Sequence, residues 1–174
     1  MRDPSAGAAV VARSMSLMLA LLLGARPVAA QTPARLAIAP AGAQVELRVE
    51  GIAARTSALQ LGAGVNVPAG RYLRLGGAVA AGAAWRSGAP RASARADGVA
   101  HFLLDPFRES PLGLYGIGGV SLMYDGFEHT RPNLVVGVGV EGTPRRGRVA
   151  AFELALGGGV RAAVIIRRAR RTGR

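Results

Sequence analysis

The 174-residue chain contains no cysteine and no lysine, and its 1 tryptophan, 3 tyrosines and 4 phenylalanines make it poor in aromatic residues. Without cysteine, a disulfide framework and any site built on thiolates are excluded. No stretch approaches the roughly 20 consecutive apolar residues that a membrane-spanning helix needs, so a helical membrane protein is excluded as well. What the chain has instead is glycine, 25 residues of it, and a composition that is 50% hydrophobic.

All cationic side chains are arginines, since the 22 basic residues include no lysine, and they outnumber the 10 acids to give a formal net charge of +12. Such a charge raises the possibility of a nucleic-acid partner. Aromatic side chains for base stacking are not interleaved with the arginines, however, and the N-terminal segment described below predicts export from the cytoplasm. We therefore predict no nucleic-acid partner.

The first 30 residues have the layout of a secretory signal. Arginines precede a short apolar run, and small residues ending at Ala30 follow it where a signal peptidase would cleave. We predict a cleavable signal peptide over residues 1–30 and an extended, proline-containing leader over residues 31–43. An uncleaved anchor or a buried helix is the alternative for the apolar run.

From Gln44 onward, apolar residues alternate with small or polar ones, which is the period of a β-strand. In the first segment, Val45, Leu47 and Val49 alternate with Glu46, Arg48 and Glu50. Eight such segments follow one another, and strands of about nine to eleven residues are long enough to cross a bilayer when tilted. The sequence predicts an all-β fold: an eight-stranded antiparallel up-and-down transmembrane β-barrel over residues 44–168, with a basic tail over residues 169–174.

The face opposite the leucines and valines is mostly glycine and alanine, with single charges between them. A water-exposed face has no need of so many glycines, whereas the narrow interior of an eight-stranded barrel needs small residues around a few long ones. We predict that five acids and four bases form ion pairs inside the barrel: Glu46, Arg48, Glu50, Arg74, Arg95, Asp97, Glu141, Glu153 and Arg161. The alternative is that these charges form solvent-facing pairs on a soluble sheet.

Six of the aromatic residues fall near the ends of the predicted strands: Tyr72, Trp85, Phe102, Phe107, Tyr124 and Phe127. Aromatic rings at the two rims are typical of membrane barrels, because an amphipathic ring is stable at the level of the lipid headgroups. These residues are therefore predicted to be interfacial.

The signal peptide, the alternating strands, the glycine-rich face and segments such as Leu114–Val120 resemble the small bacterial outer-membrane β-barrel proteins. This superfamily includes the OmpA membrane domain, OmpX and OmpW, and the resemblance covers roughly residues 44 to 168. It implies residence in the cell outer membrane, with the lipid bilayer and the outer-membrane assembly machinery as partners. The chain departs from the pattern in its short connections and in a last strand that ends Ile165–Ile166 and continues into arginines, without a terminal aromatic residue.

The predicted function is a structural or surface-interaction role in the cell envelope, with a lumen closed by ion pairs and one modest loop around Phe127. We predict no enzymatic activity, no cofactor and no metal. The six arginines between Arg161 and Arg174 could contact anionic lipid or the cell wall, and a second basic turn, at Arg145, Arg146 and Arg148, is expected on the same side.

Two other functions remain open. One is a soluble periplasmic β-barrel that binds an apolar ligand, with its leucines and valines inside. The other is a lipid-modifying outer-membrane enzyme, although the adjacent histidine–serine pair of such enzymes is absent. His101 has inward parity near Asp97, and we expect it to be a satisfied interior group.

Overall fold

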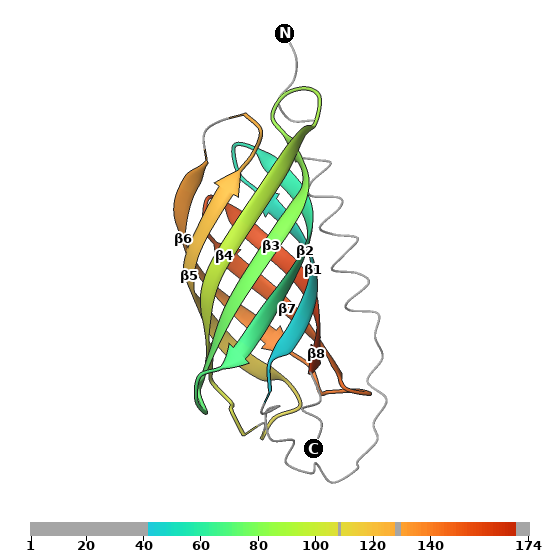
Figure 1. Cartoon of the computed structure of the whole chain (residues 1–174), viewed down its shortest axis with the longest axis vertical. Helices are drawn as coiled ribbons and strands as arrows, with labels where there is room; N and C mark the ends of the chain where they lie inside the picture. Colours follow the sequence, from blue (N-terminus) through green and yellow to red (C-terminus); the bar gives the residue numbers. More distant parts are fainter. Residues whose placement is uncertain (1–41, 108, 128–129, 170–174) are drawn as a thin grey trace. The chain divides into compact units, whose positions relative to one another are not determined.

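In the computed structural model, residues 42–107, 109–127 and 130–169 are described, and they form eight β-strands (Figure 1). The strands are β1 (Gln44–Ala53), β2 (Ser57–Pro68), β3 (Leu73–Trp85), β4 (Arg91–Leu103), β5 (Gly113–Tyr124), β6 (Arg131–Glu141), β7 (Arg148–Leu156) and β8 (Val160–Ala169). The predicted signal peptide, nearly all of the leader and residues 170–174 of the tail lie outside the described residues.

Each strand pairs antiparallel with the next, and β1 pairs with β8, so the sheet closes on itself. The prediction of an all-β, eight-stranded antiparallel up-and-down barrel is confirmed. Closure leaves no edge strand with unpaired backbone groups. Among the described residues, none belongs to a helix long and apolar enough to cross a membrane.

The barrel has two different ends. We call the end where β1 begins and β8 finishes the terminal end, which also holds residues 69–72, 104–112 and 142–147. The opposite, distal end holds the connections after β1, β3, β5 and β7, of which residues 54–56 and 157–159 are only three residues long. Figure 1 shows the strands running obliquely between these two ends.

The alternation of residues along the strands separates two faces of opposite character. Large apolar side chains point outward, and several are more than half exposed: Leu47 (65%), Leu61 (68%), Leu134 (77%) and Val136 (65%). Between the strand ends, the charged side chains of the strands are buried inside. This is the reverse of a soluble barrel, which hides its large apolar residues.

Apolar groups also close the interior at the distal end. Ile52, Ala58 and Ala84 form a buried cluster there, and Met123 and Phe127 pack against it. A second cluster, built around Leu103, Tyr115, Ile117 and Val135, packs beside the charged groups. The interior is therefore filled with side chains.

Candidate functional site: the charged interior

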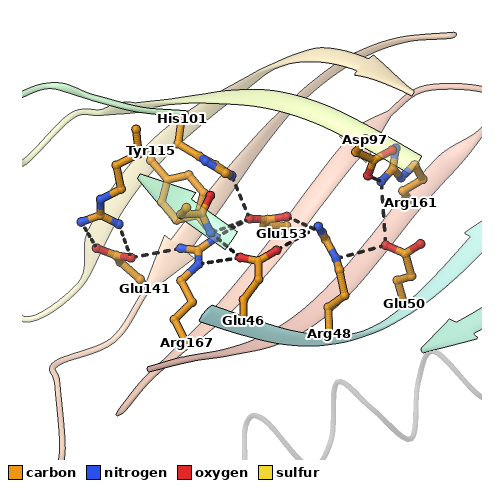
Figure 2. A network of polar contacts seen from close by, with 12 residues as sticks. Glu46, Arg48, Glu50, Asp97, His101, Tyr115, Glu141, Glu153, Arg161 and Arg167 are labelled. Atoms are coloured by element: carbon orange, nitrogen blue, oxygen red, sulfur yellow. Dashed lines mark hydrogen bonds and ion pairs between the residues drawn. The ribbon is translucent and has the colours of Figure 1, made fainter. Parts of the chain in front are cut away.

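A connected network of ion pairs runs along the inside of the barrel (Figure 2). The nine charged residues predicted to lie inside are all buried, with side chains between 0% and 7% exposed. In Figure 2 the contacts form one row, with Glu141 near one end and Glu50 and Asp97 at the other. In each strand, alternate residues point into the barrel, and these nine residues are among them. The two-residue period of the strands is therefore enough to bring them to the inner face.

The centre of the terminal half is Arg167, whose guanidinium contacts three carboxylates. Its Nε lies 3.1 Å from Glu46 Oε2, its Nη1 3.1 Å from Glu141 Oε2 and its Nη2 2.8 Å from Glu153 Oε1. Arg167 Nη2 also donates to the Tyr115 hydroxyl at 3.1 Å, and that hydroxyl donates to Glu153 Oε1 at 2.8 Å. All three nitrogens of this guanidinium thus donate within one buried site, and they use four of its five N–H groups.

Arg48 continues the network into the distal half. Its Nη2 donates to Glu153 Oε2 at 2.8 Å and its Nη1 to Glu46 Oε1 at 3.3 Å, while its Nε lies 3.4 Å from Glu50 Oε2. Arg95 then pairs with Glu50 and, at 2.6 Å, with Asp97. Arg48 therefore joins the two halves of the interior.

Several of these contacts cross the lumen between strands that are not neighbours. Arg74 on β3 binds Glu141 on β6 through two hydrogen bonds of 3.0 and 3.2 Å. Arg161 on β8 donates to Asp97 on β4 at 2.8 Å, and these two strands lie four places apart in the closed sheet. Because side chains bridge opposite walls, the lumen is occupied along its length.

Formal charge within the network sums to zero. The five carboxylates of Glu46, Glu50, Asp97, Glu141 and Glu153 meet five guanidiniums, those of Arg48, Arg74, Arg95, Arg161 and Arg167. Burying an ion is costly unless it is paired, so a one-to-one ratio is what a dehydrated interior requires. A cavity of about 10 Å³ between Arg48, Glu50 and Asp97 has room for on the order of one water molecule.

Interior glycines make room for the long side chains. Gly64 lies opposite Glu46 in the β1–β2 register, Gly62 opposite Arg48, and Gly139 opposite Tyr115 across β5–β6. A Cβ atom added to Gly139 would overlap the Tyr115 ring. The abundance of glycine on the inner face is therefore the steric counterpart of the ion-pair network.

This steric fit predicts the effect of a side chain at Gly139. Gly139→Val should lower the free energy of unfolding by about 1–3 kcal/mol, because the tyrosine ring must move away from Glu153 and Arg167. Gly118→Val is the matched control, since a Cβ there meets no atom within 4 Å. Urea titration in uncharged detergent micelles, followed by the fluorescence of the single tryptophan, Trp85, measures both variants. Equal stability of the two would contradict this role for glycine.

Arg167 was not predicted to lie inside, because the last strand was expected to end at Ile165–Ile166 and Arg167 was counted with the arginines that could contact anionic lipid or the cell wall. That interpretation is wrong for Arg167, which is 2% exposed and lies within β8. Arg161, counted with the same arginines but also predicted to lie inside, binds Asp97 in the interior. The signal was present in the sequence, since Arg161, Ala163, Ile165 and Arg167 share one parity.

His101 is buried as expected, but its neighbours differ from those inferred from the sequence. Residues four apart on one strand are about 13 Å apart, so His101 does not reach Asp97. Its Nε2 instead lies 3.5 Å from Glu153 Oε1, and its ring meets the Tyr115 ring edge-on at 5.3 Å between centroids. Among the described residues, no group of three or more histidine and acidic side chains is arranged to hold a metal.

The predicted interfacial aromatics fall at the two ends, with one exception in orientation. Tyr72, Phe102 and Phe107 lie toward the terminal end and are about half exposed; Tyr72 and Phe107 also make an edge contact at 6.4 Å. Trp85 and Tyr124 end β3 and β5 at the distal end. Phe127 instead turns over the interior, where the Arg91 guanidinium lies 4.9 Å from its ring centroid. Phe127 lies in a turn, where residues no longer alternate between the two faces. The alternation along the strands therefore does not set the direction of its ring.

Fold and site together define an eight-stranded antiparallel β-barrel with a salt-bridged interior and an apolar outer face. Among known proteins, no family model and no curated protein matches the chain. The crystal structure of the N-terminal β-barrel domain of Pseudomonas aeruginosa OprF is similar, with a TM-score of 0.48 and 13% sequence identity. The match covers 72% of this chain and 96% of that one, and it is a similarity of fold.

Proposed function

We propose that this chain is a small barrel of the bacterial outer membrane, with a closed lumen and a structural or surface-interaction role in the cell envelope. The observation that carries the proposal is the inversion of the two faces. Leucines and valines that are 43% to 77% exposed cover the outside, while five ion-paired acids and five arginines fill the inside. In water this arrangement would expose a large apolar surface, whereas in lipid that surface contacts acyl chains and the ions stay paired inside.

The strand lengths and the residues at the strand ends agree with a location in the membrane. Strands of 9 to 13 residues are long enough to cross the hydrocarbon when tilted. Within the described part, the exposed charged residues of the strands lie only at the strand ends: Arg91, Arg131, Arg148 and Arg168. Aromatic residues mark both ends, where an amphipathic ring is favoured.

A closed lumen follows from the cross-barrel pairs. Arg74, Arg161 and Arg48 each bind a carboxylate on a non-adjacent strand, so no row of one charge sign lines a path. A conducting pore would present such a ring to passing ions. The function we propose is therefore mechanical or adhesive, with the short distal connections and the loop at Phe127 as its outer surface.

The alternative of a soluble barrel with an apolar ligand cavity is not supported, because the residues that would line that cavity point outward. Leu47, Leu61 and Val138 are all more than 60% exposed. The lipid-modifying alternative is not favoured either, since His101 is enclosed between Glu153 and Tyr115 and faces away from the outer surface.

Cell fractionation tests the proposed function. We expect the chain in the outer-membrane fraction, released by detergent and not by osmotic shock, because its apolar outer face is stable only in lipid or micelles. A barrel closed by backbone hydrogen bonds should also migrate differently on a gel before and after boiling. Release by osmotic shock, with one band under both conditions, would refute the membrane assignment.

A further inference from the structure

We propose that four arginines at the terminal end of the barrel bind the phosphate of an anionic phospholipid. These residues, which we call the arginine patch, are Arg145, Arg146, Arg148 and Arg168. This inference rests on the proposed membrane location, and it adds a binding site outside the interior network.

Two members of the patch face each other directly. Arg148 on β7 and Arg168 on β8 are register partners, and both are exposed on the outer face, while their neighbours Val149 and Arg167 are buried. Side chains opposite each other on an antiparallel pair have Cβ atoms about 4.5–5.5 Å apart, and like charges in that position repel. An anion held between the two guanidiniums would remove this repulsion.

The other two members come from the turn that joins β6 to β7. Arg145 and Arg148 exchange backbone hydrogen bonds of 2.8 and 2.9 Å around Arg146 and Gly147, whose φ angles are +49° and +75°. Positive φ at both central residues is the pattern of a type I′ turn, which favours asparagine, aspartate or glycine in the first position. Arg146 therefore adopts a backbone conformation that arginine disfavours.

None of the four guanidiniums has an ion-pair partner in the part of the chain that the structure describes. Glu141, the acid at the end of β6, is turned inward to Arg74 and Arg167. Arg91 at the distal end contrasts with the patch, because it donates to the Gly126 carbonyl at 3.1 Å and its guanidinium lies over the Phe127 ring. The patch is thus a region of concentrated, uncompensated positive charge.

The patch begins where the apolar outer surface ends, which identifies the occupant as a lipid. Arg168 pairs laterally with Val45 on β1, and Ile166 precedes it on the same face; these apolar side chains are 49% and 53% exposed. A phospholipid places its phosphate beside the arginines and an acyl chain beside Val45 and Ile166. Guanidinium groups bind phosphate oxygens through paired hydrogen bonds, which suits the two opposed arginines.

Lipid selectivity measured by electron paramagnetic resonance tests this site. The full chain is reconstituted in phosphatidylcholine vesicles that contain a trace of spin-labelled phosphatidylglycerol or, in parallel, spin-labelled phosphatidylcholine. We expect the protein to restrict the anionic lipid on the order of fivefold more strongly than the zwitterionic one. Arg148→Gln/Arg168→Gln should lose this preference. The matched control, Arg55→Gln/Arg91→Gln, removes the same charge at the distal end and should keep it.

Equal selectivity in all three proteins, or none in the unmodified chain, would overturn the proposed site. Calorimetric titration of the protein in uncharged micelles separates two sources of phosphate. Binding of inorganic phosphate as tight as that of short-chain phosphatidylglycerol would overturn the assignment to lipid. The same sample also tests the proposed membrane location, because failure of the chain to insert into phosphatidylcholine vesicles would refute the membrane barrel itself.

Discussion

Replacing Arg167 with methionine is expected to lower the free energy of unfolding by about 3–5 kcal/mol. The guanidinium of Arg167 contacts Glu46, Glu141 and Glu153 at 2.8 to 3.1 Å and is 2% exposed. Its removal changes the interior from five acids and five bases to five acids and four. Each of the three carboxylates keeps a cation, but one buried negative charge is left without compensation.

Arg168→Met is the control for this prediction, because the two residues are adjacent and point to opposite faces. Arg168 is exposed and has no ion-pair partner among the described residues, so its loss should change stability by about 0.5 kcal/mol or less in uncharged micelles. Urea titration of both variants, monitored by Trp85 fluorescence, measures the difference. Similar losses for Arg167 and Arg168 would show that the interior does not depend on charge balance.

A second substitution separates charge from packing. In Arg167→Met/Glu46→Gln, the interior again holds equal numbers of acids and bases, while Asn66 can still donate to the residue at position 46 as it now does at 2.6 Å. We expect the double variant to be more stable than the sum of the two single losses predicts, which is the mark of coupled residues. A purely additive result would mean that Arg167 stabilises the barrel through its volume.

The strands and their two faces could be predicted because a single rule fixes both. A period of two sends alternate residues to opposite sides, and closure then makes one side the interior. The glycines identified which side that was, since only a narrow interior needs small residues beside long ones. The overlap of a Gly139 side chain with Tyr115 shows the steric basis of that inference.

The partners inside the barrel could not be predicted in the same way. Which residues meet across the lumen depends on how far neighbouring strands are staggered and on the reach of each side chain. His101 contacts Glu153 on β7 and not Asp97 on its own strand for this reason. Arg167 was missed because the arginines that follow it conceal the alternation that continues through β8.

Substitutions on the outer face are expected to have the next largest effect on stability. Leu61→Arg and Val138→Arg are each expected to cost about 2–4 kcal/mol of unfolding free energy in phosphatidylcholine vesicles, because both positions lie within the strands, away from the rims. Leu104→Arg is the matched control: Leu104 is 71% exposed, against 68% for Leu61, but lies beyond the end of β4. Near the lipid–water interface the same change should cost about 0–1 kcal/mol.

This comparison distinguishes lipid from water as the solvent of the outer face. If water covered it, Leu61, Val138 and Leu104 would be exposed surface residues, and arginine at any of them would change stability by about 0.5 kcal/mol or less. A large loss at Leu61 and Val138 with a small one at Leu104 can arise only where the environment changes with depth. Equal and small losses at all three positions would exclude a bilayer around the barrel, since the exposed fractions of the leucines differ too little to produce a difference by themselves.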